Sequence, residues 1–401
     1  MDLKQRLTVL RRQRGDVASD TAALPLPVEQ RLQRLYGRQR PQTSQARDEQ
    51  EVADLLGGTR IADGLIVVEQ QFPLSHQHGK HRFETLRPRL SFHLPGDSSP
   101  STEQLVFMDT ETTGLAGGTG TLAFLLGLGR MTDETFYLRQ FFLTGFRGEV
   151  ALLQAARDWV DDREYLVTFN GKSFDAPLMA TRYRLSGIPD PFAAMHHIDL
   201  FHPTRRAFRN QWVDCRLQTA ERCLLGFHRQ DDLPAYLVPE VWFAFVRRGI
   251  TRQLPGILAH NRWDLMSLAT LLPSLTEAFT APGESGADVV AVARYWLQRG
   301  DEQTALAHLR AHQDQLTTTG LLELARLYRR CQAWQHAVPI WRQLAEQDCP
   351  QALERLAKYN EHVQHDYEAA LQLTQRLRHL DQHNSSHQQR QQRLTAKRDR
   401  H

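Results

Sequence analysis

The stretch LVFMDTETTGL, residues 105–115, decides the fold of this 401-residue chain. A run of apolar residues ends in Asp109, one residue follows, and Glu111 comes next. Residues two apart in a β-strand point to the same face, so the two carboxylates lie side by side. Such a pair at the end of a buried strand is costly, because like charges repel and burial removes their water. A divalent cation relieves this cost, and oxygen ligands favour Mg²⁺ or Mn²⁺.

Three further residues, later in the chain, are candidates for the same site as Asp109 and Glu111. Asp175 follows a predicted strand at 165–171 and stands near the start of a predicted helix at 173–185. His260 and Asp264 are four residues apart in a predicted helix at 256–272, so they share one helical face. Four acids on three separate elements form the pattern of side chains that converge on metal. Taken singly, Asp175 also fits a helix N-cap, and His260 also fits a cap or surface residue.

The segments around these residues follow an α/β order. Strands are predicted at 105–109, 121–130, 135–143, 165–171 and 196–201, with a helix at 149–160. Three strands, a helix, a strand, a helix, a strand and then several helices predict a mixed sheet flanked by helices, the order of a ribonuclease H-like fold. We assign this domain to 101–280. Residues 51–100 are predicted to be a lead-in segment with short strands.

Residues 284–380 change to an almost wholly helical pattern that repeats. The recurring positions are Tyr295, Tyr328 and Tyr359, then Ala305, Ala337 and Ala369, with Asp301, Trp334 and Tyr367 ahead of the alanines. A period of about 33 residues with this mixture of small and aromatic positions resembles tetratricopeptide repeats. Three such repeats can bury a continuous core by stacking. A generic helical bundle with accidental self-similarity is the alternative, and both predict an all-α domain.

The bulk composition fits a globular protein of two or three domains. Its length exceeds one typical domain, and a hydrophobic content of 41% is enough for ordinary cores. The net charge of +3 gives no strong global field, but basic residues gather at both ends. Such ends suit a polyanion, although they are more often solubilising, poorly ordered termini. We therefore predict a polar basic segment at 1–50 and a basic tail at 381–401 that is disordered or a frayed helix.

The sequence also predicts the compartment. Its four cysteines have no CxxC spacing, which argues against a zinc or disulfide framework. No apolar run approaches the length of a membrane span, and the N-terminus has no signal-peptide core. We expect a cytoplasmic protein with reduced thiols and no membrane partner.

The motifs resemble the three exonuclease motifs of the DEDD superfamily of 3′–5′ exonucleases. Asp109 and Glu111 match the first motif, Asp175 the second and Asp264 the third. Within that superfamily the chain is most similar to the YprB-type ribonuclease H-like proteins, which also carry helical repeats behind the nuclease domain. The similarity rests on DTETTGLAGGTGT (109–121), FNGKSFDAPLM (169–179), HHIDLFHPTRR (196–206), LLGFHRQDDLP (224–234) and HNRWDLMSL (260–268).

This resemblance implies a metal-dependent 3′–5′ exonuclease that hydrolyses single-stranded DNA or RNA with two Mg²⁺ or Mn²⁺ ions. Asp109 would bridge both ions, Glu111 and Asp264 would complete one site, and Asp175 would hold the second ion. His260 would be the general base or would orient the attacking water. The alternatives are a nuclease fold that only binds nucleic acid, and a scaffold whose repeats bind a protein partner, with little or no nuclease activity.

The third motif departs from the better-known branches of the superfamily. In the histidine-type enzymes a histidine precedes the aspartate by five residues, and in the tyrosine-type a tyrosine precedes it by four. Here His260 stands at the tyrosine spacing, and its shorter ring leaves contact with the attacking water open.

Further residues are candidates for contact with the substrate strand. They are Thr110, Thr112, Asn170, Lys172 and Ser173. Lys172 would contact a phosphate, and a turn-forming role for 170–173 is the alternative. Asp199, at another strand end, could approach the metals or form hydrogen bonds at the edge of the core.

Overall fold

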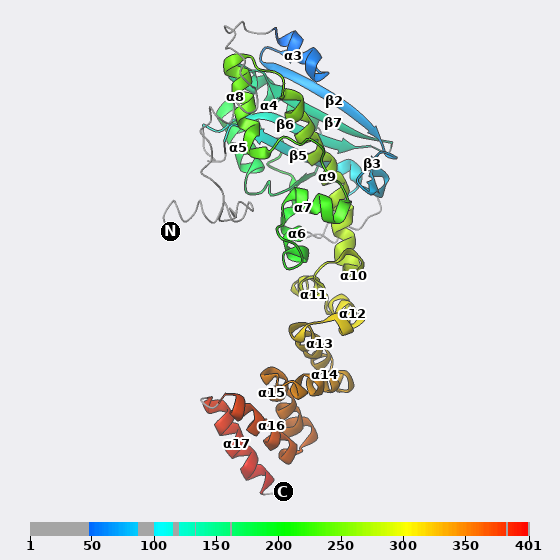
Figure 1. Ribbon diagram of the computed structural model, residues 1–401, viewed down its shortest axis with the longest axis vertical. Coiled ribbons are helices and arrows are strands. Elements are labelled where there is room, and N and C mark those ends of the chain that lie inside the picture. The colour runs from blue at the N-terminus through cyan, green and yellow to red at the C-terminus, as the bar shows by residue number, and fades with distance from the viewer. Residues whose placement is uncertain are drawn as a thin grey trace. The chain divides into compact units, whose positions relative to one another are not determined.

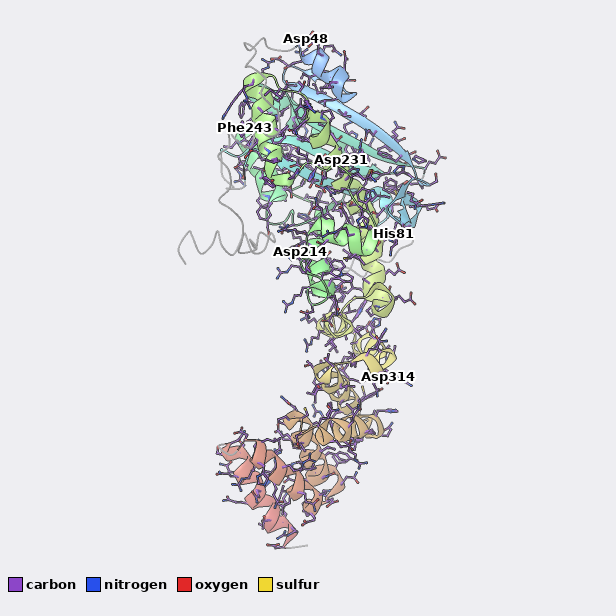
Figure 2. The ribbon with its side chains drawn as sticks, viewed as in Figure 1. Asp48, His81, Asp214, Asp231, Phe243 and Asp314 are labelled. Carbon is purple, nitrogen blue, oxygen red and sulfur yellow. The ribbon has the colours of Figure 1, made fainter. Side chains whose placement is uncertain are left out.

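The computed structural model describes residues 48–86, 100–114, 120–132, 134–160, 163–381 and 384–399. They form two compact units, one up to Thr280 and one from Ala281 (Figure 1). The basic segment predicted at 1–50 lies outside the described residues, apart from the beginning of helix α3 (Glu49–Leu56). Asp48 caps that helix, its side chain accepting a hydrogen bond from Gln50 N (Figure 2).

Seven strands of the described residues form one mixed sheet, in the order β1-β2-β7-β6-β5-β8-β9. Their bounds are β1 (Thr59–Ala62), β2 (Leu65–Pro73), β5 (Leu105–Thr112), β6 (Ala123–Met131), β7 (Thr135–Leu143), β8 (Tyr165–Thr168) and β9 (His196–Asp199). Neighbours from β1 to β5 are antiparallel, whereas β5 with β8 and β8 with β9 are parallel. The predicted mixed sheet flanked by helices is confirmed.

The strands upstream of residue 100 belong to this same sheet. β2 pairs with β7 along its whole length, from Leu65 opposite Leu143 to Pro73 opposite Thr135. A separate short hairpin, β3 (Gln77–His78) and β4 (His81–Arg82), follows it. His81 Nε2 lies 3.1 Å from Leu224 O, which fastens this hairpin to the helical part of the unit (Figure 2).

Strand β5 changes its environment halfway along. Residues 105–108 are buried, because this apolar run is in the middle of the sheet, and residues 109–112 are only partly buried. The acids therefore come where the strand leaves the core. The core itself is aromatic in places, for example where Phe124 stacks on Trp242 at 4.8 Å between ring centroids.

Helices cover the sheet and provide the remaining site residues. They are α4 (Glu149–Val160), α5 (Asp175–Ser186), α6 (Phe201–Phe208), α7 (Leu217–Ala220), α8 (Val238–Arg248) and α9 (Leu254–Thr280), with a π-helical turn η4 (Glu221–Leu225) after α7. Helix α4 packs on β2 and β7, and α9 crosses β5, β6 and β7. Helix α9 is longer than the predicted 256–272, because its last turns are buried and stay helical despite Pro273.

The described residues of the second unit are helical, which confirms the all-α prediction. The helices are α10 (Pro282–Ser285), α11 (Val289–Gln298), α12 (Glu302–Ala311), α13 (Thr318–Arg330), α14 (Trp334–Glu346), α15 (Pro350–Tyr359), α16 (Tyr367–Leu380) and α17 (Ser385–Arg398), with short turns η6 (Gln313–Gln315) and η7 (Asn360–Gln364). From α11 to α17 each helix packs against the next.

Two details of the second unit differ from the sequence prediction. Ala305 and Ala337 are fully buried, but Ala369, the third recurring alanine, is only partly buried, and its neighbour Ala370 is fully buried instead. The tail predicted as disordered or frayed contains helix α17 instead. Its Leu394 is buried, and Arg393 and Lys397 bind the buried Glu361, so packing and ion pairs stabilise a segment with few apolar residues.

None of the helices in the described residues is long and apolar enough to cross a membrane.

Candidate active site

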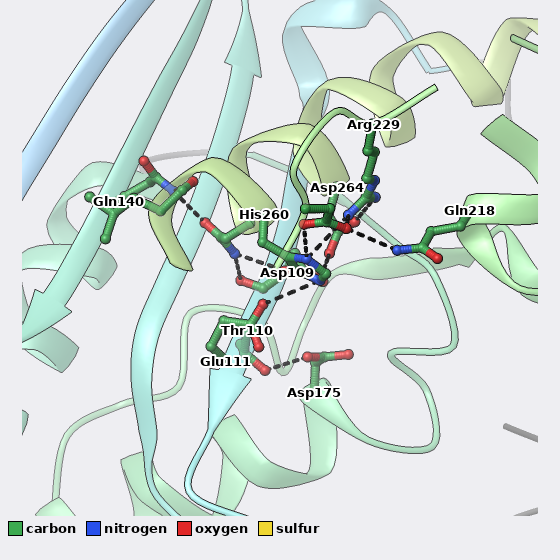
Figure 3. Close-up of polar contacts among 12 residues, drawn as sticks. Asp109, Thr110, Glu111, Gln140, Asp175, Gln218, Arg229, His260 and Asp264 are labelled. Carbon is green, nitrogen blue, oxygen red and sulfur yellow. Dashed lines mark hydrogen bonds and ion pairs between the residues drawn. The ribbon is translucent and has the colours of Figure 1, made fainter. Parts of the chain in front are cut away.

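Asp109 and Glu111 lie on the side of β5 that faces α9 (Figure 3). Asn261 of α9 donates through Nδ2 to Asp109 Oδ2 at 2.8 Å and to the Asp109 carbonyl at 3.2 Å. Glu111 shares this face because it is two residues further along the strand. Its Oε1 lies 3.9 Å from His260 Nε2. The sheet and α9 thus bring the first and third sequence motifs together.

A hydrogen bond from the buried Gln140 amide positions Asn261. Gln140 on β7 donates through Nε2 to Asn261 Oδ1 and to Leu258 O, both at 2.8 Å. Gly127 on β6 leaves the space for this pair, since a Cβ there would lie 2.2 Å from Asn261 Oδ1. Three strands and α9 therefore fix the orientation of the Asp109 carboxylate.

Asp175 is the first residue of α5. The N-cap residue is Phe174, and it makes no side-chain cap, so the interpretation of Asp175 as the N-cap is wrong. A carboxylate in the first helical turn is favoured by the helix dipole. Thr110 Oγ1 donates a hydrogen bond to Asp175 Oδ1, which ties the second motif to β5 (Figure 3).

Asp199 shapes the turn that leads to Asp175. Its buried carboxylate accepts backbone hydrogen bonds from Asn170 at 2.6 Å, Lys172 at 3.0 Å and Phe201 at 3.1 Å. Asn170 has a positive φ of 65°, which an asparagine tolerates in a tight turn. Of the two options for Asp199, hydrogen bonding at the edge of the core is the one that matches its contacts.

The candidate substrate contacts fall into two groups. Thr110 donates to Asp175, and Thr112 makes a local hydrogen bond from Oγ1 to Gly114 O at 3.1 Å. The turn contains Asn170, Lys172 and Ser173, closed by a hydrogen bond from Ser173 N to Asn170 O at 3.2 Å. The Lys172 and Ser173 side chains are exposed beside Asp175. The structure thus shows the turn-forming role of 170–173. Contact of these side chains with a nucleic-acid substrate stays a prediction.

His260 and Asp264 share a face of α9, as their spacing predicts. His260 Nε2 lies 3.5 Å from Asp264 Oδ2, and both side chains are buried. Glu111, His260 and Asp264 each offer one ligand atom, and these atoms all lie within 4.8 Å of one another. Two carboxylates and an imidazole at this separation can bind one divalent cation.

Sequence reasoning missed a buried ionic network behind Asp264. Arg229 contacts Glu221 twice, from Nε to Oε2 at 2.8 Å and from Nη2 to Oε1 at 2.6 Å. Its Nη2 also binds Asp264 Oδ1 (Figure 3). Asp232 Oδ2 accepts from Arg229 at 3.3 Å and from Gln218 at 3.0 Å. The Arg229 side chain is only 5% exposed, so its charge is neutralised by these acids rather than by water.

The clustered acids of the site shift the pKa values of Asp109 and His260. Burial raises the pKa of Asp109, and the nearby charges of Asp264, Glu111 and Asp175 raise it further, against the hydrogen bond from Asn261. Burial lowers the pKa of His260, but Asp264, a hydrogen bond with Asp232, and Glu111 together raise it to about 9. A bound cation would oppose both shifts. Four carboxylates from three elements are also the oxygen donors that Mg²⁺ and Mn²⁺ prefer, so the residues fit such an ion.

The missed residues left a signal in the sequence. Asp232 and Arg229 both lie in LLGFHRQDDLP, and Asn261 follows His260 directly. Arg229, Asp231 and Asp232 stand between apolar residues of that segment, which is a signal for polar contacts. Their partners could not be read from the sequence, since Arg229 and Asp264 are 35 residues apart.

The chain is similar to known proteins. Residues 106–276 match the RNase_H superfamily. The chain is 32% identical over 335 residues to the uncharacterized protein YprB of Bacillus subtilis (strain 168), covering 77% of this chain and 79% of the relative. A family B DNA polymerase from the hyperthermophilic archaeon Pyrobaculum calidifontis is 13% identical with a TM-score of 0.36, over 67% of this chain and 36% of the polymerase. A score this low supports no conclusion about activity.

Proposed function

Because the chain belongs to the family of YprB and has the nuclease-like fold of the RNase_H superfamily, we propose that it is a metal-dependent 3′–5′ exonuclease. Its substrate would be single-stranded DNA or RNA. The observation that carries the proposal is that ligand atoms of Glu111, His260 and Asp264 lie within 4.8 Å of one another. The charges of Asp264, Glu111 and Asp175, together with burial, also raise the pKa of Asp109. Such a cluster is costly without a cation.

The residues present suit two Mg²⁺ or Mn²⁺ ions. Asp109 would contact both, Glu111 and Asp264 would complete one site, and Asp175 would hold the second. When bound, such ions lower the pKa of a water molecule and neutralise charge on the scissile phosphate. The chain itself supplies orientation: Asn261 holds Asp109, Arg229 holds Asp264, and Thr110 holds Asp175. His260 lies beside Glu111 and Asp264, where it could accept a proton from water or act as a ligand.

The exposed turn before α5 would receive the substrate backbone. Lys172 is exposed three residues before Asp175, and its ammonium group could contact a phosphate. Thr112 and Ser173 would add hydroxyl contacts. This arrangement gives contacts to phosphate and sugar rather than to base edges, which suits hydrolysis without sequence preference.

One gel experiment tests the proposal. Single-stranded DNA and RNA, labelled at either end, are incubated with the protein and Mg²⁺ or Mn²⁺, and wild type is compared with Asp109→Ala and Asp264→Ala. The proposal predicts shortening from the 3′ end by the wild type alone. Degradation that survives either substitution in a folded variant would contradict it.

A second role is favoured by the helices of the other unit. The packing of each helix against the next and the buried Ala305 and Ala337 support tetratricopeptide-like repeats that bind a protein partner. A partner retained by the full chain and lost on removing 284–401, with nuclease activity unchanged, would support this role.

The proposed location is cytoplasmic, and the four cysteines are unpaired, as thiols are in a reducing compartment.

A further inference from the structure

His260 is placed to bind a metal ion rather than only to act on water. Its Nε2 lies 3.5 Å from Asp264 Oδ2 and 3.9 Å from Glu111 Oε1. Ligand atoms that each bind one ion at roughly 2.1 Å are separated by about 3 to 4 Å. A direct charge-assisted hydrogen bond is shorter, at about 2.8 Å. The observed spacing is therefore that of ligands around a shared ion.

The other ring nitrogen provides an independent observation. His260 Nδ1 lies 2.7 Å from Asp232 Oδ1, and the His260 side chain is only 7% exposed. Metal-ligating histidines almost always donate their second ring N–H to a carboxylate or carbonyl, which fixes the tautomer and the ring orientation. With the proton on Nδ1, the lone pair of Nε2 faces Glu111 and Asp264.

Asp232 is itself held in place by neighbouring side chains. Arg229 contacts its Oδ2 at 3.3 Å and Gln218 donates to the same oxygen at 3.0 Å. Arg229 also binds Asp264 Oδ1, so Asp264 Oδ2 remains on the side of the His260 Nε2 atom. The Arg229 guanidinium thus orients Asp264 directly and orients His260 through Asp232.

We propose that Glu111, His260 and Asp264 form a mixed oxygen–nitrogen site that prefers a first-row transition-metal dication such as Mn²⁺ to Mg²⁺, with Asp232 as a positioning residue. Imidazole is a good ligand for transition metals, whereas Mg²⁺ demands oxygen ligands in near-octahedral geometry. This assignment rests on the proposed metal dependence of the site but not on nuclease activity. It makes His260 a ligand and not the general base.

Pulsed electron paramagnetic resonance of the full chain with substoichiometric Mn²⁺ tests the ligand directly. A bound imidazole nitrogen gives ¹⁴N modulation of the Mn²⁺ echo. We expect this modulation in the wild type, its loss in His260→Gln, and its retention in His228→Gln, which alters an exposed histidine of the neighbouring loop. Bound Mn²⁺ without ¹⁴N modulation in the wild type, or unchanged modulation in His260→Gln, would overturn the assignment.

Calorimetric titration with Mn²⁺ and Mg²⁺ tests the preference and the positioning role. The wild type should bind Mn²⁺ at least about tenfold more tightly than Mg²⁺. Asp232→Asn keeps the side-chain shape and should weaken Mn²⁺ binding by about 10- to 100-fold. Unchanged affinity in a folded Asp232→Asn, or wild-type Mn²⁺ affinity in an inactive His260→Gln, would contradict the proposal. Mn²⁺ binding with the nitrogen signature in a chain that degrades no nucleic acid would support this site and refute the proposed function.

Discussion

Asn261 Nδ2 lies 2.8 Å from Oδ2 of Asp109, so an amide on α9 sets the direction of the central carboxylate on β5. The amide cannot turn away freely, because Gln140 donates to its oxygen from the opposite side at 2.8 Å. A buried chain of hydrogen bonds thus connects β7, α9 and β5. Its effect is to fix the orientation of the Asp109 carboxylate.

Gly127→Ala should disturb this chain without altering any proposed ligand. The added methyl would lie 2.2 Å from Asn261 Oδ1 and 2.7 Å from Leu265 Cδ1, so α9 or the amide must shift. We expect a loss of stability of about 1 to 3 kcal/mol and at least a tenfold loss of nuclease rate. The control is Gly145→Ala, where a Cβ would meet nothing within 4 Å. Equal rates in both variants would show that the position of Asn261 is unimportant.

Arg229→Met should destabilise the first unit strongly. The substitution keeps an unbranched apolar stem, although a shorter one, and leaves Glu221 and Asp264 buried without their shared guanidinium. Removing one partner of a buried ion pair costs about 3 to 5 kcal/mol, so urea unfolding should show a loss of this size. Arg229→Lys keeps the charge without the guanidinium fork and should lose less. A loss below about 1 kcal/mol in Arg229→Met would mean that the network contributes little.

Glu49, which is not one of the proposed metal ligands, should stabilise the protein in a pH-dependent way. Burial would raise its pKa, but hydrogen bonds from Arg60, Thr144, Arg147 and the Gly64 backbone lower it to about 2 from an ordinary value of 4.5. Because the folded-state pKa is the lower one, the stabilisation is present above pH 4.5 and is lost as the pH falls towards 2.

Glu49→Gln provides the measurement. At pH 7 the variant should be less stable by about 1 to 2 kcal/mol, since hydrogen bonds to charged groups weaken and partly exposed arginines are screened by solvent. The difference from wild type should shrink between pH 4.5 and pH 2. Glu51→Gln, on the exposed side of the same helix, is the control. A difference that stays constant with pH would contradict the lowered pKa.

The second unit offers a test of its own packing. Ala337 is fully buried in α14, and a larger side chain there would force the neighbouring helices apart. Ala337→Leu should cost about 1 to 3 kcal/mol of stability through overpacking. Mn²⁺ binding should be unchanged, because the proposed ligands all belong to the other unit. Unchanged thermal unfolding would contradict close packing at this alanine.

The sequence predicted most of the sheet because its strands have clear apolar patterns. Residues 135–143 were expected as a strand and form β7, and the paired acids made the end of β5 recognisable. Contacts between distant segments could not be predicted in this way. Asn261 meets Asp109 across 152 residues, and the meeting depends on Gly127 having no side chain. The tail was predicted as disordered or a frayed helix, and the packing of α17 could not be foreseen because it depends on ion pairs with Glu361 rather than on an apolar face.

The rate at which a 3′-labelled single strand loses its terminal nucleotide, in wild type and in Asp109→Asn, tests the central claim most directly. Asn keeps the shape of the side chain and removes the charge that lies among three other acids. With Mg²⁺ or Mn²⁺ present, the variant should be slower by about a thousandfold or more, while its thermal unfolding remains cooperative. A rate within about threefold of wild type in the folded variant would contradict a metal-dependent nuclease centred on Asp109.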